Sequence, residues 1–273
     1  AIKVTANNQR LDIKTSGVER SNTALKIDSL TLKSDSLPEL PQMTENVRYD
    51  GSLKASVILK DLAPFVPALS RFEEPLDLNL VFSGHGKHLD CPTLRLTTHH
   101  GLMIAGEAAL STWDAGMDMY IYGKLGNLTM TKEGINVLMT NLTGKVPPIL
   151  QRLDYIRFNG EAAGYLHDLT LTGLFHTGAG MVKTDVMMSI DEQSMSRTYS
   201  GSVASADLDL GKLLNQEKKF GKVDFNVELK GFNYKNRYPE SYIKGIISSF
   251  EYSQYQYDNI MLDGVYKDGG FNG

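Results

Sequence analysis

Histidine and cysteine are the residue types in this chain that best suit metal chemistry, and several of them lie close together in the sequence. A zinc site needs imidazole and thiolate groups that converge on one point. The candidates in this stretch are His85, His88, Cys91, His99 and His100. The strand that we predict over residues 93–98 separates the first histidine pair from the second by about 20 Å of extended chain. This spacing favours turn residues in water, so we predict no metal site; His167 and His176 also have no partner at ligand spacing.

The sequence motifs of nucleophilic and phosphate-binding sites do not occur in the chain. Gly84-His-Gly86 and Gly178-Ala-Gly180 are interpreted as turns, because neither opens a helix after a buried parallel strand. Acidic pairs occur at Glu73-Glu74 and Asp191-Glu192, beside predicted loops, whereas a glycosidase needs two carboxylates that face one cleft. We therefore expect no enzymatic activity and no cofactor.

A short apolar cluster followed by an alternating strand that ends at glycine occurs three times in the chain. The copies recur roughly every 65–80 residues, and such a period is typical of stacked units that cannot bury their apolar faces alone. The cluster and the strand span 61–69 and 76–84 in the first copy, 138–142 and 153–160 in the second, and 207–214 and 221–231 in the third. This pattern indicates a long surface rather than a pocket with chemistry.

The composition of the 273 residues is that of an ordinary globular protein, with 41% hydrophobic and 22% charged residues. The net charge is −4 and no basic stripe is present, which argues against nucleic-acid binding. Cys91 is the single cysteine, so no internal disulfide forms, and no apolar run approaches the length that spans a bilayer. The strand-like first residues and the turn at 267–273 lead us to expect a segment cut from a longer protein.

Alternation with period two runs through most of the chain and predicts strands with one dry face and one wet face. Short turns between them predict an all-β fold: an elongated antiparallel meander of curved, trough-like sheet in repeated units. Short helices are expected only near 62–69, 132–142 and 208–214. We also predict a turn at Asp50-Gly51 and a strand over Met117–Tyr122.

The repeats suggest an organisation into four parts. Residues 1–46 form N-terminal strands and a linker that contains Pro38 and Pro41. The first β repeat unit spans 47–111, the second, with its short helix, spans 112–197, and the third, truncated, spans 198–273.

Uniformly apolar strand faces carry the strongest functional signal. The candidate groove residues are Leu76, Leu78, Leu80, Phe82, Leu94, Leu96, Val223, Phe225, Val227 and Leu229. Polar residues such as Asp77 and Lys222 alternate with them. Facing sheets would seal these side chains in a core, whereas an open curved sheet would use them to line a groove. Several methionines in strands suit a surface that accepts varied apolar partners, although core filling gives the same pattern.

Tyrosines are concentrated in the last unit. They are Tyr234, Tyr238, Tyr242, Tyr252, Tyr255 and Tyr257. They suit either a glycan-binding platform or cross-strand aromatic packing, and the second interpretation needs no ligand.

The last unit resembles the periplasmic region of AsmA-like and TamB-like proteins, and most closely the TamB type of Gram-negative anaerobes. The resemblance rests on strand patterning over 206–214, 220–231, 243–252 and 257–273. It is good over 198–273, fair over 47–111 and weak over 112–190, where the cluster is longer and carries Pro147-Pro148.

This resemblance implies a curled open sheet with an apolar lining, in a periplasmic protein anchored in the inner membrane by a helix outside this chain. It implies phospholipid or other apolar chains as partners, with roles in lipid transport between membranes and in outer-membrane assembly, and it transfers no catalytic residue. The alternatives are a structural or adhesive β-repeat protein with a sealed core, and a glycan-binding module.

Overall fold

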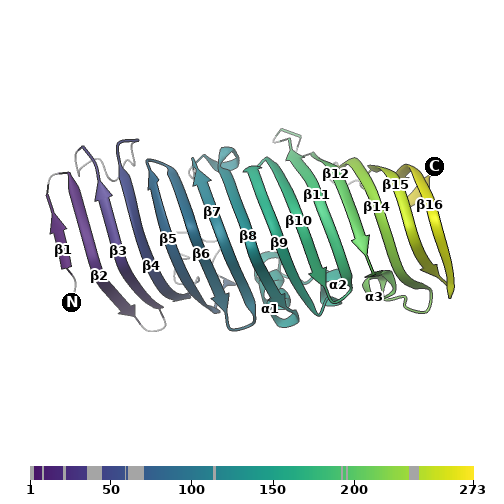
Figure 1. Cartoon of the computed structure of the whole chain (residues 1–273), viewed down its shortest axis with the longest axis horizontal. Helices are drawn as coiled ribbons and strands as arrows, with labels where there is room; N and C mark the ends of the chain where they lie inside the picture. Colours follow the sequence, from purple (N-terminus) through teal and green to yellow (C-terminus); the bar gives the residue numbers. More distant parts are fainter. Residues whose placement is uncertain are drawn as a thin grey trace. The chain divides into compact units, whose positions relative to one another are not determined.

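The computed structural model describes residues 3–7, 9–20, 23–35, 45–58, 60, 71–112, 115–191, 193–194, 196–233 and 240–273. The chain divides into two compact units, which we call unit 1 (Ala1–Val146) and unit 2 (Pro147–Gly273). In both units the strands run as an antiparallel meander with a few short helices, which confirms the predicted all-β fold class (Figure 1). The division falls inside the predicted repeat 112–197, and the repeat boundaries themselves stay a prediction.

The described residues of unit 1 form eight strands, each hydrogen-bonded to the next along the chain. The strands are β1 (Lys3–Ala6), β2 (Arg10–Arg20), β3 (Thr23–Lys33), β4 (Arg48–Ile58), β5 (Pro75–His85), β6 (His88–Thr98), β7 (Leu102–Ser111) and β8 (Tyr120–Thr131). A 3-10 turn, η4 (Gly116–Asp118), precedes β8, and α1 (Lys132–Thr143) follows it.

Unit 2 begins with α2 (Pro148–Gln151) and continues as a second meander, in which α3 (Leu210–Leu214) lies between β13 and β14. The strands are β9 (Tyr155–Tyr165), β10 (Asp168–Thr177), β11 (Gly180–Ile190), β12 (Arg197–Ala206), β13 (Leu208–Asp209), β14 (Phe220–Asn233), β15 (Glu240–Tyr252), β16 (Tyr255–Lys267) and β17 (Gly270–Asn272). Strand β14 pairs with both β12 and the short β13. The turn predicted near 268 is present and leads into β17.

Helix α1 begins where the sequence supplies a cap. The Thr131 hydroxyl accepts a hydrogen bond from the backbone N–H of Gly134 at 3.1 Å, and Gly144 ends the helix in the left-handed conformation. Helix α3 begins in the same way, because the Asp209 carboxylate accepts from the Lys212 N–H at 2.8 Å. The helices predicted at 132–142 and 208–214 are therefore confirmed, and the one predicted at 62–69 lies outside the described residues.

Three local predictions were wrong or incomplete. Asp50-Gly51 is not a turn but part of β4, because the Phe82 ring packs against Gly51, where a Cβ atom would lie 2.9 Å from it. The strand predicted from Met117 begins only at Tyr120, since the N–H groups of Asp118 and Met119 close a 3-10 turn. Helix α2 was not predicted; Pro148 occupies its first turn, where the missing N–H costs nothing.

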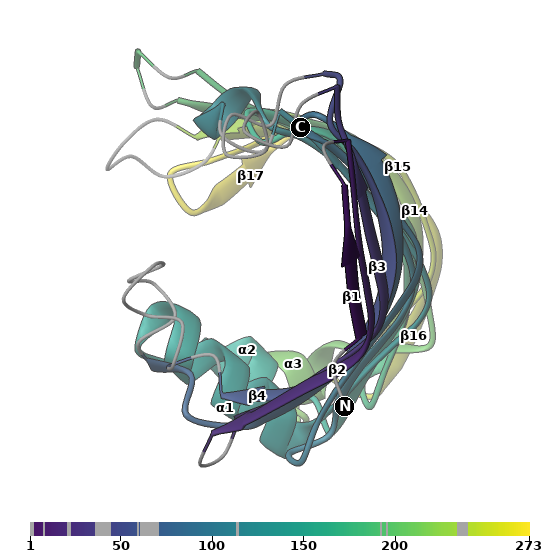
Figure 2. The same ribbon diagram turned by 90° about the vertical axis from the view of Figure 1, so that its left-hand side faces the viewer.

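The strands β14, β15 and β16 of unit 2 bend into an arc, and α3 lies on the inner side of that arc (Figure 2). Gly245 in β15 has a φ of 155° and Gly201 in the neighbouring β12 has a φ of 139°, values that favour glycine and permit strand bending. No helix among the described residues is long and apolar enough to cross a membrane.

Candidate functional site

The apolar residues predicted in the first repeat lie together on one face of unit 1. Leu78 and Leu80 of β5 lie directly opposite Leu96 and Leu94 of β6, and opposite partners in an antiparallel pair share a face. Leu76 and Phe82 belong to the same face of β5 because the side-chain period of a strand is two.

The strand register extends this face across unit 1. One row of opposite partners runs from Ile27 through Leu53, Leu80 and Leu94 to Gly106. A second row runs from Ala55 through Leu78, Leu96 and Ile104 to Leu128. We call the side chains of these rows, with Leu76 and Phe82, the apolar face of unit 1.

Unit 2 has an apolar face of its own, built around β14. Phe225 lies opposite Ile247, Leu229 opposite Ile243, and Val223 opposite Phe250. Val227 has Val203 of β12 on one side and Gly245 of β15 on the other. The face continues to β9 and β10, where the rings of Phe158 and Phe175 lie 4.5 Å apart. We call these side chains the apolar face of unit 2.

Most of these side chains are only half-buried. Of the ten predicted residues, Leu76, Val223 and Val227 are buried and the other seven are intermediate. The buried ones include Val223, which is 4% exposed where β14 contacts α3, whereas the neighbouring Lys222 is exposed. Since α3 lies on the inner side of the arc, the apolar face of unit 2 is its concave face (Figure 2).

The opposite faces of β5 and β14 are mainly polar. Asp77 and Ser83 are exposed on β5, and Lys222, Asn226 and Glu228 are exposed on β14. These two strands therefore have one apolar and one polar face, and among the described residues no second sheet covers the apolar face.

Some tyrosines of the last unit form the cross-strand aromatic packing that we considered, whereas others remain exposed, as a glycan-binding platform would require. Tyr252 packs against Phe220 and Phe250, with ring centroids 5.5 and 6.1 Å apart, as cross-strand packing requires. Tyr255 is 71% exposed and makes no such pair among the residues described. Tyr234 and Tyr238 lie outside the described residues.

Histidine side chains bond to neighbouring polar groups, and the rings of His85 and His88 lie 5.4 Å apart. His88 contacts the Ser111 hydroxyl at 2.6 Å and the Asp90 carboxylate at 3.1 Å, at the start of β6. His100 contacts Glu74 at 2.6 Å, beyond the other end of that strand. Within the described part of the chain, no three histidine, cysteine or acidic residues lie close enough to hold a metal ion.

The other candidate reactive residues, the cysteine and the acidic pairs, are buried or bonded to neighbouring groups. Cys91 is buried, and its burial, with Asp90 nearby, raises the pKa of the thiol, which disfavours the reactive thiolate. Glu73 forms an ion pair with Lys60 that lowers the pKa of the carboxyl group. Asp191 accepts hydrogen bonds from the N–H and the hydroxyl of Ser194, and these bonds lower the pKa of the Asp191 carboxyl group.

Sequence reasoning missed residues that join the apolar faces through strand register. They include Leu53, Ile104, Leu128, Phe158, Phe175, Ile243, Ile247 and Phe250. The same period-two alternation marks them, so an extension of the pattern to every predicted strand would have found them.

Comparisons with protein-family models, with curated proteins and with solved structures find no match to this chain. The two apolar faces and their partial exposure are the features of the chain that bear on its function.

Proposed function

We propose that this chain is a non-enzymatic segment of an AsmA-like or TamB-like envelope protein, and that its apolar faces carry the acyl chains of phospholipids. The observation that carries the proposal is the partial exposure of most apolar side chains on the concave side of the bent sheet of unit 2. Contiguous exposed apolar surface on a folded protein marks an interaction site.

Acyl chains suit this surface for two physical reasons. The side chains are aliphatic and aromatic with few hydrogen-bonding groups, so affinity comes from removing apolar area from water, at about 25 cal/mol per Å². The rows run from strand to strand, so an apolar chain that moves along them meets a similar environment at each step. Such a surface holds apolar chains without strong preference for one position.

The sealed-core alternative fits less well. A β-sandwich needs a second sheet that packs about 10 Å from the first and buries the inward side chains. Leu78, Leu80, Phe225 and Leu229 are half-buried instead. This difference favours an open groove over a passive structural repeat.

The cellular setting follows from the resemblance. We propose a periplasmic location, with membrane contact through parts of the parent protein outside this chain, and outer-membrane assembly proteins as further partners. The polar outer faces suit an aqueous compartment, since Lys222, Asn226 and Glu228 can remain hydrated there.

The test places a charge on the apolar face. Phe225→Asp is compared with Asn226→Asp, which introduces the same charge one residue later on the polar face. A photoreactive residue at Leu229 reports capture of phospholipid from vesicles of phosphatidylethanolamine and phosphatidylglycerol, and the melting temperature reports folding. An open groove hydrates the new carboxylate, so the Phe225 variant stays folded and loses capture, while the Asn226 variant keeps both.

A sealed core predicts a different result for Phe225→Asp. An unpaired carboxylate in a sealed core costs several kcal/mol and unfolds the unit. Unfolding of the Phe225 variant, together with no lipid captured by the parent chain, would refute the transport proposal.

A further inference from the structure

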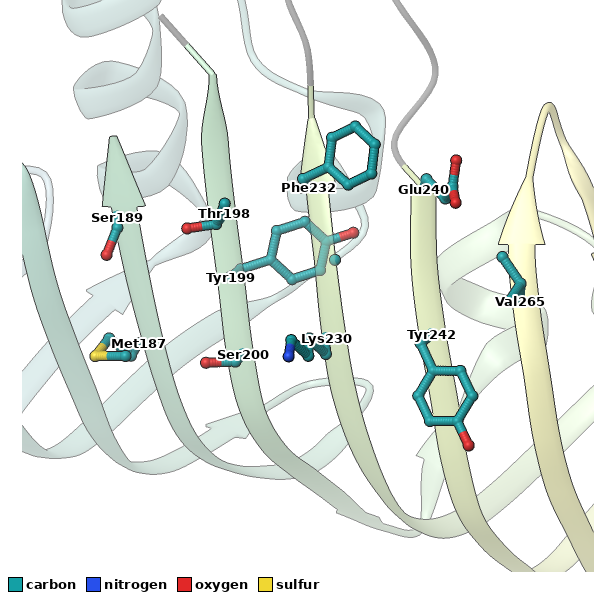
Figure 3. Close-up of a pocket in the computed structure, with 11 residues that line it drawn as sticks. Met187, Ser189, Thr198, Tyr199, Ser200, Lys230, Phe232, Glu240, Tyr242 and Val265 are labelled. Atoms are coloured by element: carbon teal, nitrogen blue, oxygen red, sulfur yellow. The ribbon is translucent and has the colours of Figure 1, made fainter. Parts of the chain in front are cut away.

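A second candidate site lies on the polar face of unit 2, near the ends of β11, β12, β14, β15 and β16. It is a pocket of about 420 Å³, within the range of roughly 300–1,000 Å³ that small-molecule sites occupy. Figure 3 shows the lining side chains. Most of the lining side chains alternate with those of the apolar face, which distinguishes the pocket from the proposed lipid groove; Tyr199 and Gly231, which also line it, occupy positions of the apolar face.

Strand register shows how the pocket is built. One row of opposite partners runs through Met187, Ser200, Lys230, Tyr242 and Val265, and these five side chains line the pocket. The adjacent row contributes Ser189, Thr198, Phe232 and Glu240. The small side chains of β12 form the floor, and the larger side chains of β11, β14 and β15 form the walls (Figure 3).

The walls of the pocket expose apolar surface. Met187 and Phe232 are each 45% exposed, and Tyr242 is 42% exposed. The Tyr242 hydroxyl donates to Asp263 at 2.6 Å, so the ring is held while its polar end is already bonded. The exposed apolar parts of these three side chains can pack against an apolar group of a ligand.

The polar groups that remain available in the pocket are donors. Among the described residues, no carboxylate pairs with Lys230, and the hydroxyls of Ser200 and Thr198 make no side-chain hydrogen bond. The acidic member of the lining, Glu240, is bonded to Lys267 at 2.9 Å, and the Ser189 hydroxyl donates to Asp168. Lys230 and Ser200 lie directly opposite each other on neighbouring strands, so their side chains project from the same face of the sheet.

We propose that this pocket binds an amphiphile with a single anionic head group, carboxylate or phosphate, attached to an apolar chain. The head group accepts from the Lys230 ammonium and the Ser200 hydroxyl, and the chain lies against Phe232, Met187 and Tyr242. A charge-assisted hydrogen bond to Lys230 selects the anion over a neutral amphiphile.

The test uses three photoreactive probes that carry a diazirine on a twelve-carbon chain: dodecanoate, dodecyl phosphate and dodecanol. Adducts on the full chain are mapped by peptide mass spectrometry, and affinity is measured by titration below the micelle concentration. We expect anionic probes to label β11 and β14 at the pocket, and the stronger of the two identifies the head group.

Matched variants distinguish probe binding in the pocket from probe binding elsewhere on the chain. Ser200→Leu fills the floor and is expected to abolish pocket adducts, whereas Ser202→Leu changes the next outward residue of the same strand, outside the lining, and leaves them. Lys230→Met lowers the affinity for the anion by about tenfold or more, as loss of one charge-assisted bond predicts, and Lys244→Met does not.

Equal labelling by dodecanol and dodecanoate, or pocket adducts that persist in Ser200→Leu, would overturn the proposal, as would absence of pocket adducts. Phe225→Asp should leave pocket adducts intact, so failure of this site and failure of the lipid groove are distinguishable. Lys230 is exposed, so its variant is expected to fold, and the melting temperature checks this.

Discussion

The ring of Tyr199 on β12 lies across Gly231 on β14, so closely that a Cβ atom on Gly231 would be 2.5 Å from the phenolic oxygen. Unit 1 repeats this arrangement. Tyr49 on β4 lies opposite Gly84 on β5, where a Cβ atom would be 2.7 Å from the phenolic oxygen. In the first and third copies, an aromatic ring from a neighbouring strand therefore covers the glycine that ends the repeated strand, a known way to protect glycine in a sheet.

Gly231→Ala is expected to destabilise unit 2 by about 1–3 kcal/mol, the usual cost of overpacking. The added methyl group also meets the backbone oxygen of Glu240 at 2.4 Å, which cannot move without disturbing β15. Urea denaturation followed by circular dichroism measures the effect. Gly123→Ala is the control, since no atom lies within 4 Å of its added Cβ, and equal stability of the two variants would contradict the prediction.

The sequence predicted most of the strands, the two capped helices and the placement of the ten apolar residues on one face of their strands, because period-two alternation and capping are local signals. It did not predict that Tyr49 lies on Gly84, since register between strands is set by contacts across the sheet. The error at Asp50-Gly51 has the same origin: the dipeptide is a typical turn, but Phe82 packs on Gly51 and keeps the strand continuous. The pocket at Lys230 depends on five strands and has no local signal.

Thr131→Ala is expected to lower the stability of unit 1 by about 1–2 kcal/mol. The Thr131 hydroxyl accepts from the Gly134 N–H and donates to the carbonyl of His100 at 2.6 Å, so the change removes a helix cap and a link to the turn after β6. Thr131→Ser should retain most of the stability because it keeps the hydroxyl. A thermal melt in which both variants behave alike would show that the hydroxyl contributes little.

Tyr49 should make unit 1 sensitive to alkali. Burial is the main cause that raises the pKa of its phenol from 10.0 to about 12, with Asp90 and Cys91 adding to it. The folded state therefore holds this proton more tightly than the unfolded state. The contribution to the free energy of unfolding is fully present below pH 10 and is lost as the pH rises towards 12.

Tyr49→Phe is expected to flatten this alkaline loss. The variant also loses the hydrogen bond to the His88 carbonyl at 2.6 Å, which costs about 1 kcal/mol at neutral pH. Melting temperatures from pH 8 to 12 compare the two proteins. Parallel curves would mean that Tyr49 does not cause the alkaline dependence.

Leu80→Asp places a charge on the apolar face of unit 1, and Val81→Asp is its control. Val81 is 41% exposed on the opposite face, so Val81→Asp adds the same charge to water. Leu80 is half-buried, so its variant is expected to remain folded with a modest loss of stability and to bind fewer acyl chains. Loss of folding in Leu80→Asp alone would indicate a sealed core.

The most direct measurement of the central claim is a photo-crosslinking scan along β14 in the presence of phospholipid vesicles. A photoreactive residue is placed in turn at Phe225, Asn226, Glu228 and Leu229, which alternate between the two faces. The proposed groove predicts lipid adducts at Phe225 and Leu229 and few at Asn226 and Glu228, a pattern with the period of the strand. Equal capture at all four positions, or none at Phe225 and Leu229 in the folded protein, would contradict a lipid-carrying apolar face.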